Sequence, residues 1–364
     1  MTAGTLASLT NSIFASLDLP LASDEMGIGQ SPFRRECLVL IDGLGSLSLN
    51  EYGKDFPIFA QGIRKDINSI FPTTTTVNLT SLATGVMPGT HGMLGYTVRV
   101  PRSGEPGRLL NALKWDERVD PVIWQPVPTL FERAVDFGIN TSQISAKRYE
   151  DTGFTRAALR GANYIGANQI PEIVDQSAIA LKDENSFAYV YINHVDVAGH
   201  EDGVGSEKWI ASLGIVSELL IQLKEKLPRG TRIWVSADHG MMNAEEKLVL
   251  GKDNPLLTGV TLIGGEPRAR HLYLREGALD EAKSAYENYL GEKALVLSKN
   301  EAISGKFFGD FVSEASHERI GDLIVIPKNG LILIDPERVK PESAMVGHHG
   351  GLDEIEALIP LLAY

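Results

Sequence analysis

Residues 236–241, SADHGM, place an aspartate beside a histidine directly after a run that predicts a buried strand, RIWV at 232–235. A carboxylate and an imidazole just outside a core need a polar partner, and a divalent cation is the strongest candidate. The alternative is that Asp238 caps a helix and His239 faces solvent. On this stretch alone the two interpretations weigh about equally, so the rest of the chain has to decide between them.

Two more aspartates follow predicted buried strands. The run CLVLI at 37–41 ends in Asp42, and FAYVYI at 187–192 leads to Asp196, with His200 four residues later. Ligand-binding side chains of open α/β sheets lie at the carboxyl ends of the strands, so we expect Asp42, Asp196 and Asp238 to gather at one sheet edge. For Asp42 taken alone, a helix cap or turn is an equally good interpretation.

The segment FPTTTTVNLTSLATG at 71–85 contains four consecutive threonines, at 73–76. The spacing predicts a helix from about 76 to 83 that stops at Gly85. The threonines therefore lie at a helix N-terminus, where free N–H groups and the helix dipole favour an anion. Hydroxyls there suit a nucleophile that attacks phosphorus or sulfur. One threonine could instead be only a cap, but four exceed what capping requires.

The whole chain predicts an α/β fold, with a mostly parallel sheet and helices on both faces, because strands and helices alternate. We expect one catalytic domain over 1–364, with 255–340 as a small subdomain inside it. In that part we expect strands at 271–274 and 322–326, a helix at 280–290, and 331–334 as a hairpin partner of the second strand. Elsewhere we expect a peripheral helix or arm at 5–17, further helices at 127–138, 170–183 and 209–227, a strand at 141–145, and a polar connection at 152–160.

Composition restricts the class of protein. The net charge of −13, without a cluster of Lys or Arg, argues against a nucleic-acid polymer or an anionic membrane as the main partner. The single cysteine, Cys37, excludes an internal disulfide and reads as a small buried hydrophobe. There is no signal peptide and no apolar run of 18 residues, so we expect a cytoplasmic protein. The oligomeric state is left open.

Three carboxylates in one crevice repel each other unless metal ions neutralise them. Three histidines, His200, His239 and His349, accompany them in the sequence. This mixture of oxygen and nitrogen ligands suits zinc first and manganese second. Six such ligands are enough for two ions, and two ions about 3.5–4 Å apart form the usual clamp for displacement at phosphorus.

In this order, the motifs resemble the type I phosphodiesterase/nucleotide pyrophosphatase family of the alkaline phosphatase superfamily. They are LIDG at 40–43, FPTTT at 71–75 with Asn78 and TG at 84–85, PGTHG at 88–92, Asp196 with His200, SADHGM, and His349 with Gly350. Each motif is weak by itself, but the ordered set is specific and spans nearly the whole chain. The resemblance implies an alkaline-phosphatase-like three-layer sandwich.

The resemblance also implies roles. One metal ion would be held by Asp196, His200 and His349. The other would be held by a second set that includes the nucleophile: Asp42, Asp238, His239 and the hydroxyl of Thr75. Attack by Thr75 would give a phosphothreonine intermediate, which a metal-activated hydroxide then hydrolyses. His349 is preferred over His348 because Gly350 follows it, as in the family.

Two substrate-binding residues are expected from the resemblance, Asn78 and Tyr96. The family usually has an aromatic residue directly after the nucleophile, where this chain has Thr76, and an asparagine where it has Tyr96. A tyrosine hydroxyl can donate the same hydrogen bond to a phosphate oxygen, and the alternative donor is the Thr75 backbone N–H. These departures leave nucleotide specificity open.

The sequence therefore predicts a two-zinc hydrolase of small phosphoric esters, with diesters slightly favoured. A phosphomonoesterase or a phosphonate hydrolase on the same scaffold is the alternative among enzymes. Sulfatase chemistry is disfavoured because the only cysteine lies within the first strand. Outside the enzymes, the alternative is a non-catalytic protein whose metal ions serve folding alone.

Overall fold

The computed structural model describes residues 4–104 and 107–364. Its largest sheet has seven strands in the order β2-β17-β8-β1-β7-β5-β6. In that order they span Ile63–Asn68, Leu358–Ala363, Arg232–Ser236, Arg35–Ile41, Ser186–Ile192, Asn140–Ser145 and Asn163–Gly166. The strands from β8 to β6 run parallel, while β17 is antiparallel to both of its neighbours. The predicted mostly parallel sheet is confirmed.

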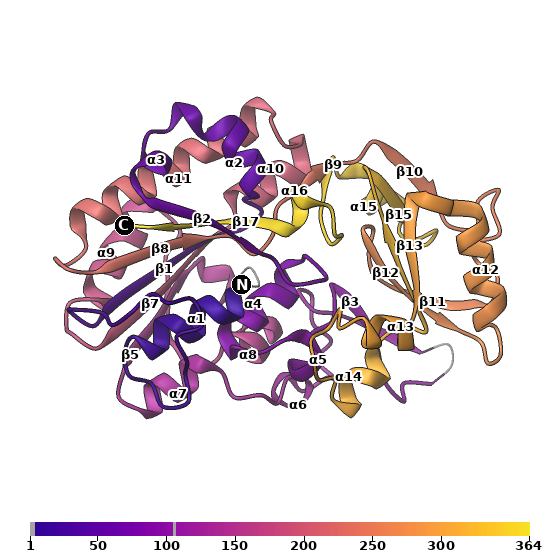
Figure 1. The fold of residues 1–364 in the computed structure, drawn as a ribbon, viewed down its shortest axis with the longest axis horizontal. Helices are drawn as coiled ribbons and strands as arrows, with labels where there is room; N and C mark the ends of the chain where they lie inside the picture. Colours follow the sequence, from indigo (N-terminus) through magenta and orange to yellow (C-terminus); the bar gives the residue numbers. More distant parts are fainter. Residues whose placement is uncertain (1–3, 105–106) are drawn as a thin grey trace.

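Helices cover both faces of this sheet, which gives three layers (Figure 1). One face carries α2 (Ser46–Tyr52), α3 (Ile58–Gln61), α9 (Ile170–Ala180), α10 (His194–Asp202) and α11 (Glu207–Lys226). The other carries α1 (Leu6–Ala15), α4 (Thr75–Thr84), α7 (Leu130–Asp136) and α8 (Gly153–Ala158). Because both faces are covered, β1 contains a continuous apolar run, residues 37–41, which is buried throughout.

A second, smaller sheet lies at the other end of the molecule (Figure 1). It is antiparallel in the order β11-β12-β14-β13, and α12 (Leu279–Leu290) packs beside it. Its strands span Val260–Glu266, Ala269–Leu274, Leu323–Pro327 and Ala294–Ser298. The two strands and the helix expected in this region are confirmed as β12, β14 and α12. The sheet and helix enclose an apolar cluster of their own.

The hairpin expected after β14 is wrong. Residues Leu331–Ile334 form β15, which pairs in parallel with β10 (Glu246–Val249). Both edges of β14 are already hydrogen-bonded, one to β12 and the other to β13, so the chain that follows has no free edge to pair with.

The peripheral helix or arm expected at 5–17 is buried instead. Leu6, Leu9 and Phe14 of α1 have no exposed surface, and α1 packs on α4. The apolar periodicity is weak because polar residues of α1 are buried too. Thr10, for example, satisfies its hydroxyl by donating to the Leu6 carbonyl.

The connection expected at 152–160 contains α8, which Thr152 caps by accepting a hydrogen bond from the Thr155 N–H. The remaining elements are short and mostly join the two sheets: α5 (Pro88–His91), α6 (Pro121–Trp124), α13 (Lys299–Ser304), α14 (Glu314–Arg319), α15 (Val339–Ala344), α16 (Glu354–Ala357), the β3/β4 pair (Thr97–Val100, Arg108–Asn111) and the β9/β16 pair (Met242–Asn243, Gly347–His348).

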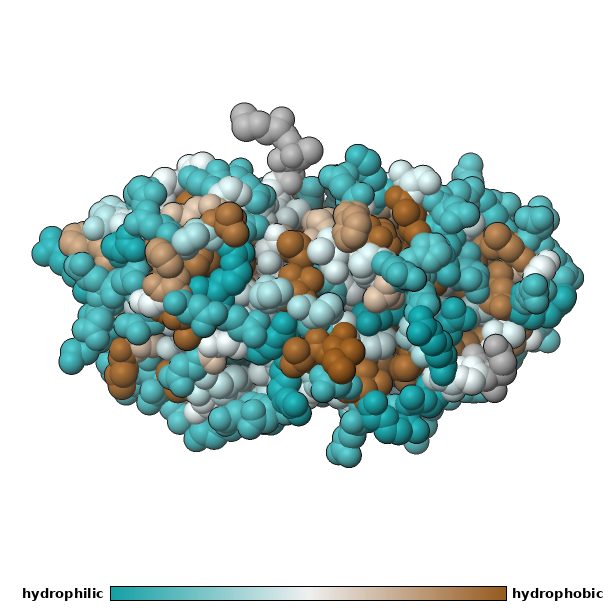
Figure 2. Space-filling view, turned by 90° about the horizontal axis from the view of Figure 1, so that it is seen from below, coloured by the Kyte–Doolittle hydropathy of each residue, from teal (hydrophilic) through white to brown (hydrophobic). Residues whose placement is uncertain are grey.

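Seen from below, the surface is largely hydrophilic, with apolar side chains in small groups (Figure 2). Within the described residues, no helix has both the length and the apolar character that crossing a bilayer requires.

Candidate active site

The three predicted aspartates meet at the carboxyl ends of three adjacent strands. Asp42 follows β1, Asp196 lies in the first turn of the helix after β7, and Asp238 comes two residues after β8. Gly43 allows the close approach, since its φ is +78° and a Cβ there would lie 2.9 Å from the Asp196 Cα. The sheet topology therefore gathers the carboxylates that the strand pattern predicts.

Histidines complete two groups of potential metal ligands. Asp42, Asp238 and His239 each offer an atom within 4.8 Å of the other two, and so do Asp196, His239 and His349. The His239 Nε2 lies 3.4 Å from both Asp42 Oδ1 and Asp238 Oδ2. His200 also reaches this place, because its Nε2 lies 3.3 Å from Asp196 Oδ1.

All three histidine rings are held through the same ring atom, Nδ1. The Nδ1 atoms of His200, His239 and His349 donate to the backbone carbonyls of Gly347, Gly240 and Thr73 at 2.8, 2.9 and 2.9 Å. A proton held on Nδ1 leaves the lone pair of Nε2 free, and this second hydrogen bond is the one that metal-binding histidines ordinarily make. Each Nε2 faces a carboxylate of the cluster.

The carboxylates carry an unbalanced charge. Asp42 Oδ1, Asp196 Oδ1 and Asp238 Oδ2 are buried and have no hydrogen-bond partner among the described residues. Burial, together with the charges of Asp238 and Asp196, raises the pKa of Asp42 well above its usual range. Burial also raises the pKa of Asp238. Unpaired oxygens that face imidazole nitrogens fit divalent cations, so the donor set is suited to a metal centre.

Thr75 lies beside these ligands as the first residue of α4, and its Oγ1 is 3.2 Å from His239 Nε2. Its neighbours have other partners, since the Thr73 hydroxyl donates to the Gly351 carbonyl and the Thr76 hydroxyl to that of Gly95. Gly85 ends the helix with a φ of +71°, as the sequence predicts.

The two residues expected to bind substrate lie in different places. Asn78 is fully buried, and its side chain bonds with the backbone of Ile70, Pro72 and Thr74. It therefore positions the turn before α4 and does not reach the site. Tyr96 does line a cavity that also contains Thr75, His200 and His349.

His348 points elsewhere. It is nearly fully buried, it lies on β16 opposite Met242, and it belongs to neither ligand group. His349 stacks on His239 instead, with ring centroids 3.6 Å apart. Of the two adjacent histidines, the geometry therefore brings His349 into the cluster.

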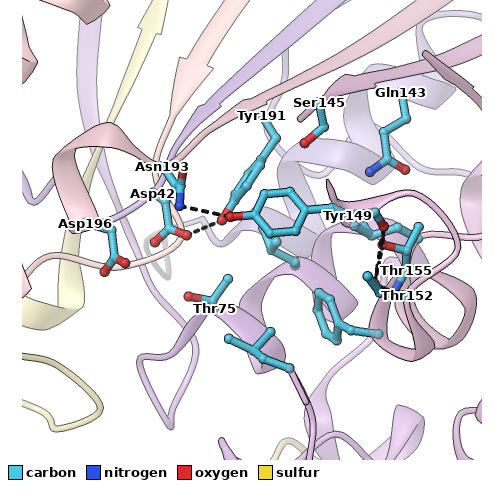
Figure 3. Close-up of a pocket in the computed structure, with 14 residues that line it drawn as sticks. Asp42, Thr75, Gln143, Ser145, Tyr149, Thr152, Thr155, Tyr191, Asn193 and Asp196 are labelled. Carbon is cyan, nitrogen blue, oxygen red and sulfur yellow. Dashed lines mark hydrogen bonds between the residues drawn. The ribbon is translucent and has the colours of Figure 1, made fainter. Parts of the chain in front are cut away.

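Thr75 also lines a second cavity, and Figure 3 shows the residues around it. Its walls include two tyrosines that sequence reasoning missed, Tyr149 and Tyr191, whose ring centroids are 6.0 Å apart. Tyr191 donates its hydroxyl to Asp42 Oδ2. Only the strand alternation, which places residue 191 on the opposite face from 190 and 192, could have pointed to it. Gln143, Ser145 and Asn193 add polar groups to the lining.

A model of the type I phosphodiesterase/nucleotide pyrophosphatase family matches residues 37–352. The chain belongs to this family and is a hydrolase of that class. No curated protein matches it in sequence.

Solved structures share the fold. Murine ectonucleotide pyrophosphatase/phosphodiesterase 5 superposes with a TM-score of 0.69 at 17% identity, over 91% of this chain and 88% of that one. An inactive variant of the murine protein has been seen in complex with AMP. Phosphonoacetate hydrolase from Sinorhizobium meliloti 1021, in complex with phosphonoformate, superposes with a TM-score of 0.66 at 19% identity, over 92% of this chain and 90% of that one.

Metal should stabilise the protein strongly. Zn²⁺ at 100 to 1,000 times its dissociation constant should raise the free energy of unfolding by about 3–4 kcal/mol over EDTA-treated protein. In Asp238→Asn the metal-free protein should unfold at a higher temperature than wild type, because repulsion is relieved, and the response to Zn²⁺ should shrink. Thermal unfolding with and without Zn²⁺ checks both statements. An equal response of the two proteins to Zn²⁺ would contradict the assignment.

Proposed function

We propose that the protein hydrolyses small phosphoric esters, diesters ahead of monoesters, through Thr75 and two bound divalent ions. Zinc is the first choice of ion and manganese the second. The observation that carries the proposal is the arrangement around the Thr75 hydroxyl. Three imidazoles with unprotonated Nε2 atoms and three carboxylates with unpaired oxygens gather beside one hydroxyl at a helix N-terminus.

Each part of the arrangement has a chemical role in this proposal. Asp196, His200 and His349 would hold one ion, and Asp42, Asp238, His239 and Thr75 the other. The ions would lower the pKa of the Thr75 hydroxyl and neutralise charge that develops on the phosphoryl oxygens. The unpaired N–H groups in the first turn of α4 would bind the same oxygens.

The reaction proceeds in two displacements. Thr75 Oγ forms a bond to phosphorus as the bond to the first alcohol breaks, and that alcohol leaves with a proton. Water then attacks phosphorus, the bond to Thr75 breaks, and the hydroxyl is restored. Its place at the start of a ten-residue helix with a buried far end keeps the nucleophile fixed between the two steps.

The two cavities that meet at Thr75 favour diesters. Thr75 and Asp196 line both cavities, so a substituent on each side of phosphorus has a place to bind. Tyr149 and Tyr191 give one cavity an aromatic wall, and Tyr96 lines the other. The position after the nucleophile holds no aromatic ring to stack on a base, because Thr76 is buried and bonded to Gly95.

A phosphonate hydrolase is the second candidate, favoured by the likeness in fold to phosphonoacetate hydrolase. Here the bond that breaks joins phosphorus to carbon, and the same cluster would hold the phosphonate. The cytoplasmic location expected from the sequence stays a prediction.

Hydrolysis of two p-nitrophenyl substrates tests the function. Zinc-loaded protein should cleave bis-p-nitrophenyl phosphate with a kcat/KM at least about tenfold above that for p-nitrophenyl phosphate, a difference of about 1.4 kcal/mol in barrier. EDTA should abolish both reactions. A monoester preference would move the assignment to a phosphatase. Cleavage of phosphonoacetate alone would favour the second candidate.

A further inference from the structure

The Asp42 carboxylate has two oxygens in different surroundings. Oδ1 is buried, has no hydrogen-bond partner among the described residues, and faces His239 Nε2 at 3.4 Å. Oδ2 accepts a hydrogen bond from the Tyr191 hydroxyl (Figure 3). A carboxylate held at one oxygen has a fixed plane, so only the other oxygen is presented to the ligand cluster.

The tyrosine itself is held on rigid structure. Tyr191 lies on β7 opposite Leu40 of β1, and the Asp42 N–H donates to the Ile192 carbonyl at 3.0 Å. The donor and the acceptor are therefore placed by neighbouring strands in the middle of the sheet.

A second side chain, Tyr149, packs against the Tyr191 ring. The contact is edge-on, with ring planes at 72°. The Tyr149 hydroxyl accepts from Asn193 Nδ2 at 3.0 Å and from Arg148 at 2.9 Å. Tyr149 thus restricts the Tyr191 ring, and the Tyr191 hydroxyl points at one oxygen of Asp42.

We propose that Tyr191 is a positioning residue of the metal centre, which fixes the Asp42 carboxylate so that Oδ1 faces the place where Asp42, Asp238 and His239 would hold an ion. The inference rests on the proposed two-metal function. It predicts a selective effect, because the Tyr191 hydroxyl donates to Asp42 and forms no hydrogen bond with Asp196, His200 or His349.

Tyr191→Phe removes only the hydroxyl, and Tyr189→Phe is its matched control. Tyr189 lies on the same face of β7, and its buried hydroxyl has no partner among the described residues. Zn²⁺ should be titrated into metal-free protein in competition with a chromophoric chelator, so that the two sites are resolved. In Tyr191→Phe one site should weaken by about 10- to 100-fold and the other should stay unchanged.

The control should bind both ions as wild type does, and excess Zn²⁺ should restore the hydrolysis rate of Tyr191→Phe. Wild-type affinity at both sites of Tyr191→Phe would overturn the inference. So would equal weakening of both sites, or equal weakening in the two variants, because either result reports packing alone. Failure of wild type to bind two ions, or to cleave any phosphoric ester or phosphonate, would instead refute the proposed function.

Discussion

Thr75→Ala should lose at least about three orders of magnitude in kcat for the diester while still binding metal, because the nucleophile is gone and most ligands remain. Loss of Thr75 removes one hydroxyl from a group that keeps Asp42, Asp238 and His239. The measurement is steady-state hydrolysis beside metal content by elemental analysis. Undiminished hydrolysis at full metal content would contradict the role of Thr75.

Two conservative variants, one of Thr75 and one of its neighbour Thr76, serve as controls for the loss of the hydroxyl. Thr75→Ser keeps a hydroxyl and should retain measurable activity. Thr76→Ser keeps the hydroxyl that donates to the Gly95 carbonyl, so its activity should stay near that of wild type. If no variant of the run affected a protein that binds two ions, the non-catalytic metal-binding alternative would gain support.

Arg268→Met should lower the free energy of unfolding by about 3–5 kcal/mol, because it leaves a buried charge without its partner. Arg268 and Glu356 have no exposed surface, and the Arg268 Nε donates to both Glu356 oxygens at 3.1 and 3.2 Å. The guanidinium also donates to Asp353 and to the Leu331 carbonyl. Chemical denaturation, followed by circular dichroism, measures the loss.

An exposed pair provides the control. Arg275 and Glu281 are about 60% exposed, so Arg275→Met should cost less than about 1 kcal/mol. The double variant Arg268→Met/Glu356→Leu should recover part of the loss, since it removes both charges. A double variant no more stable than Arg268→Met would show that packing, not the unpaired carboxylate, accounts for the effect.

The sequence was sufficient for four strands of the central sheet, β1, β5, β7 and β8, and for the carboxylates. Asp42, Asp196 and Asp238 each come shortly after an apolar run, and parallel strands end at one edge whatever their order in the sheet. The strand signal and the functional signal therefore coincide at the same positions.

The edge of the sheet was harder to predict. Residues 63–68, IRKDIN, form β2, but most of their side chains are exposed, so they lack an apolar pattern. Residues 358–363, LIPLLA, include a proline, which weakens a strand prediction. Both strands depend on long-range pairing, since β2 pairs with β17 and β17 also pairs with β8, and the first of these pairings joins segments almost 300 residues apart.

The roles of Asn78 and Tyr191 depend on tertiary contacts. Asn78 belongs to a matching motif, yet its amide faces the backbone of the turn before α4. Tyr191 belongs to no motif and still reaches Asp42 at the end of the neighbouring strand. Spacing in the sequence indicates which residues share an element, but it does not say which way a side chain points.

The late position of β17 has a consequence for synthesis on the ribosome. This strand pairs with β8, which leads to Asp238, and His349 lies only nine residues before it begins. A nascent chain that has emerged only as far as residue 340 holds every strand from β1 to β8, yet it lacks one ligand and one sheet neighbour. All three carboxylates have then emerged, but His349 has not, so we expect ion capture to be completed only after the last strand is translated and to stabilise the finished sheet.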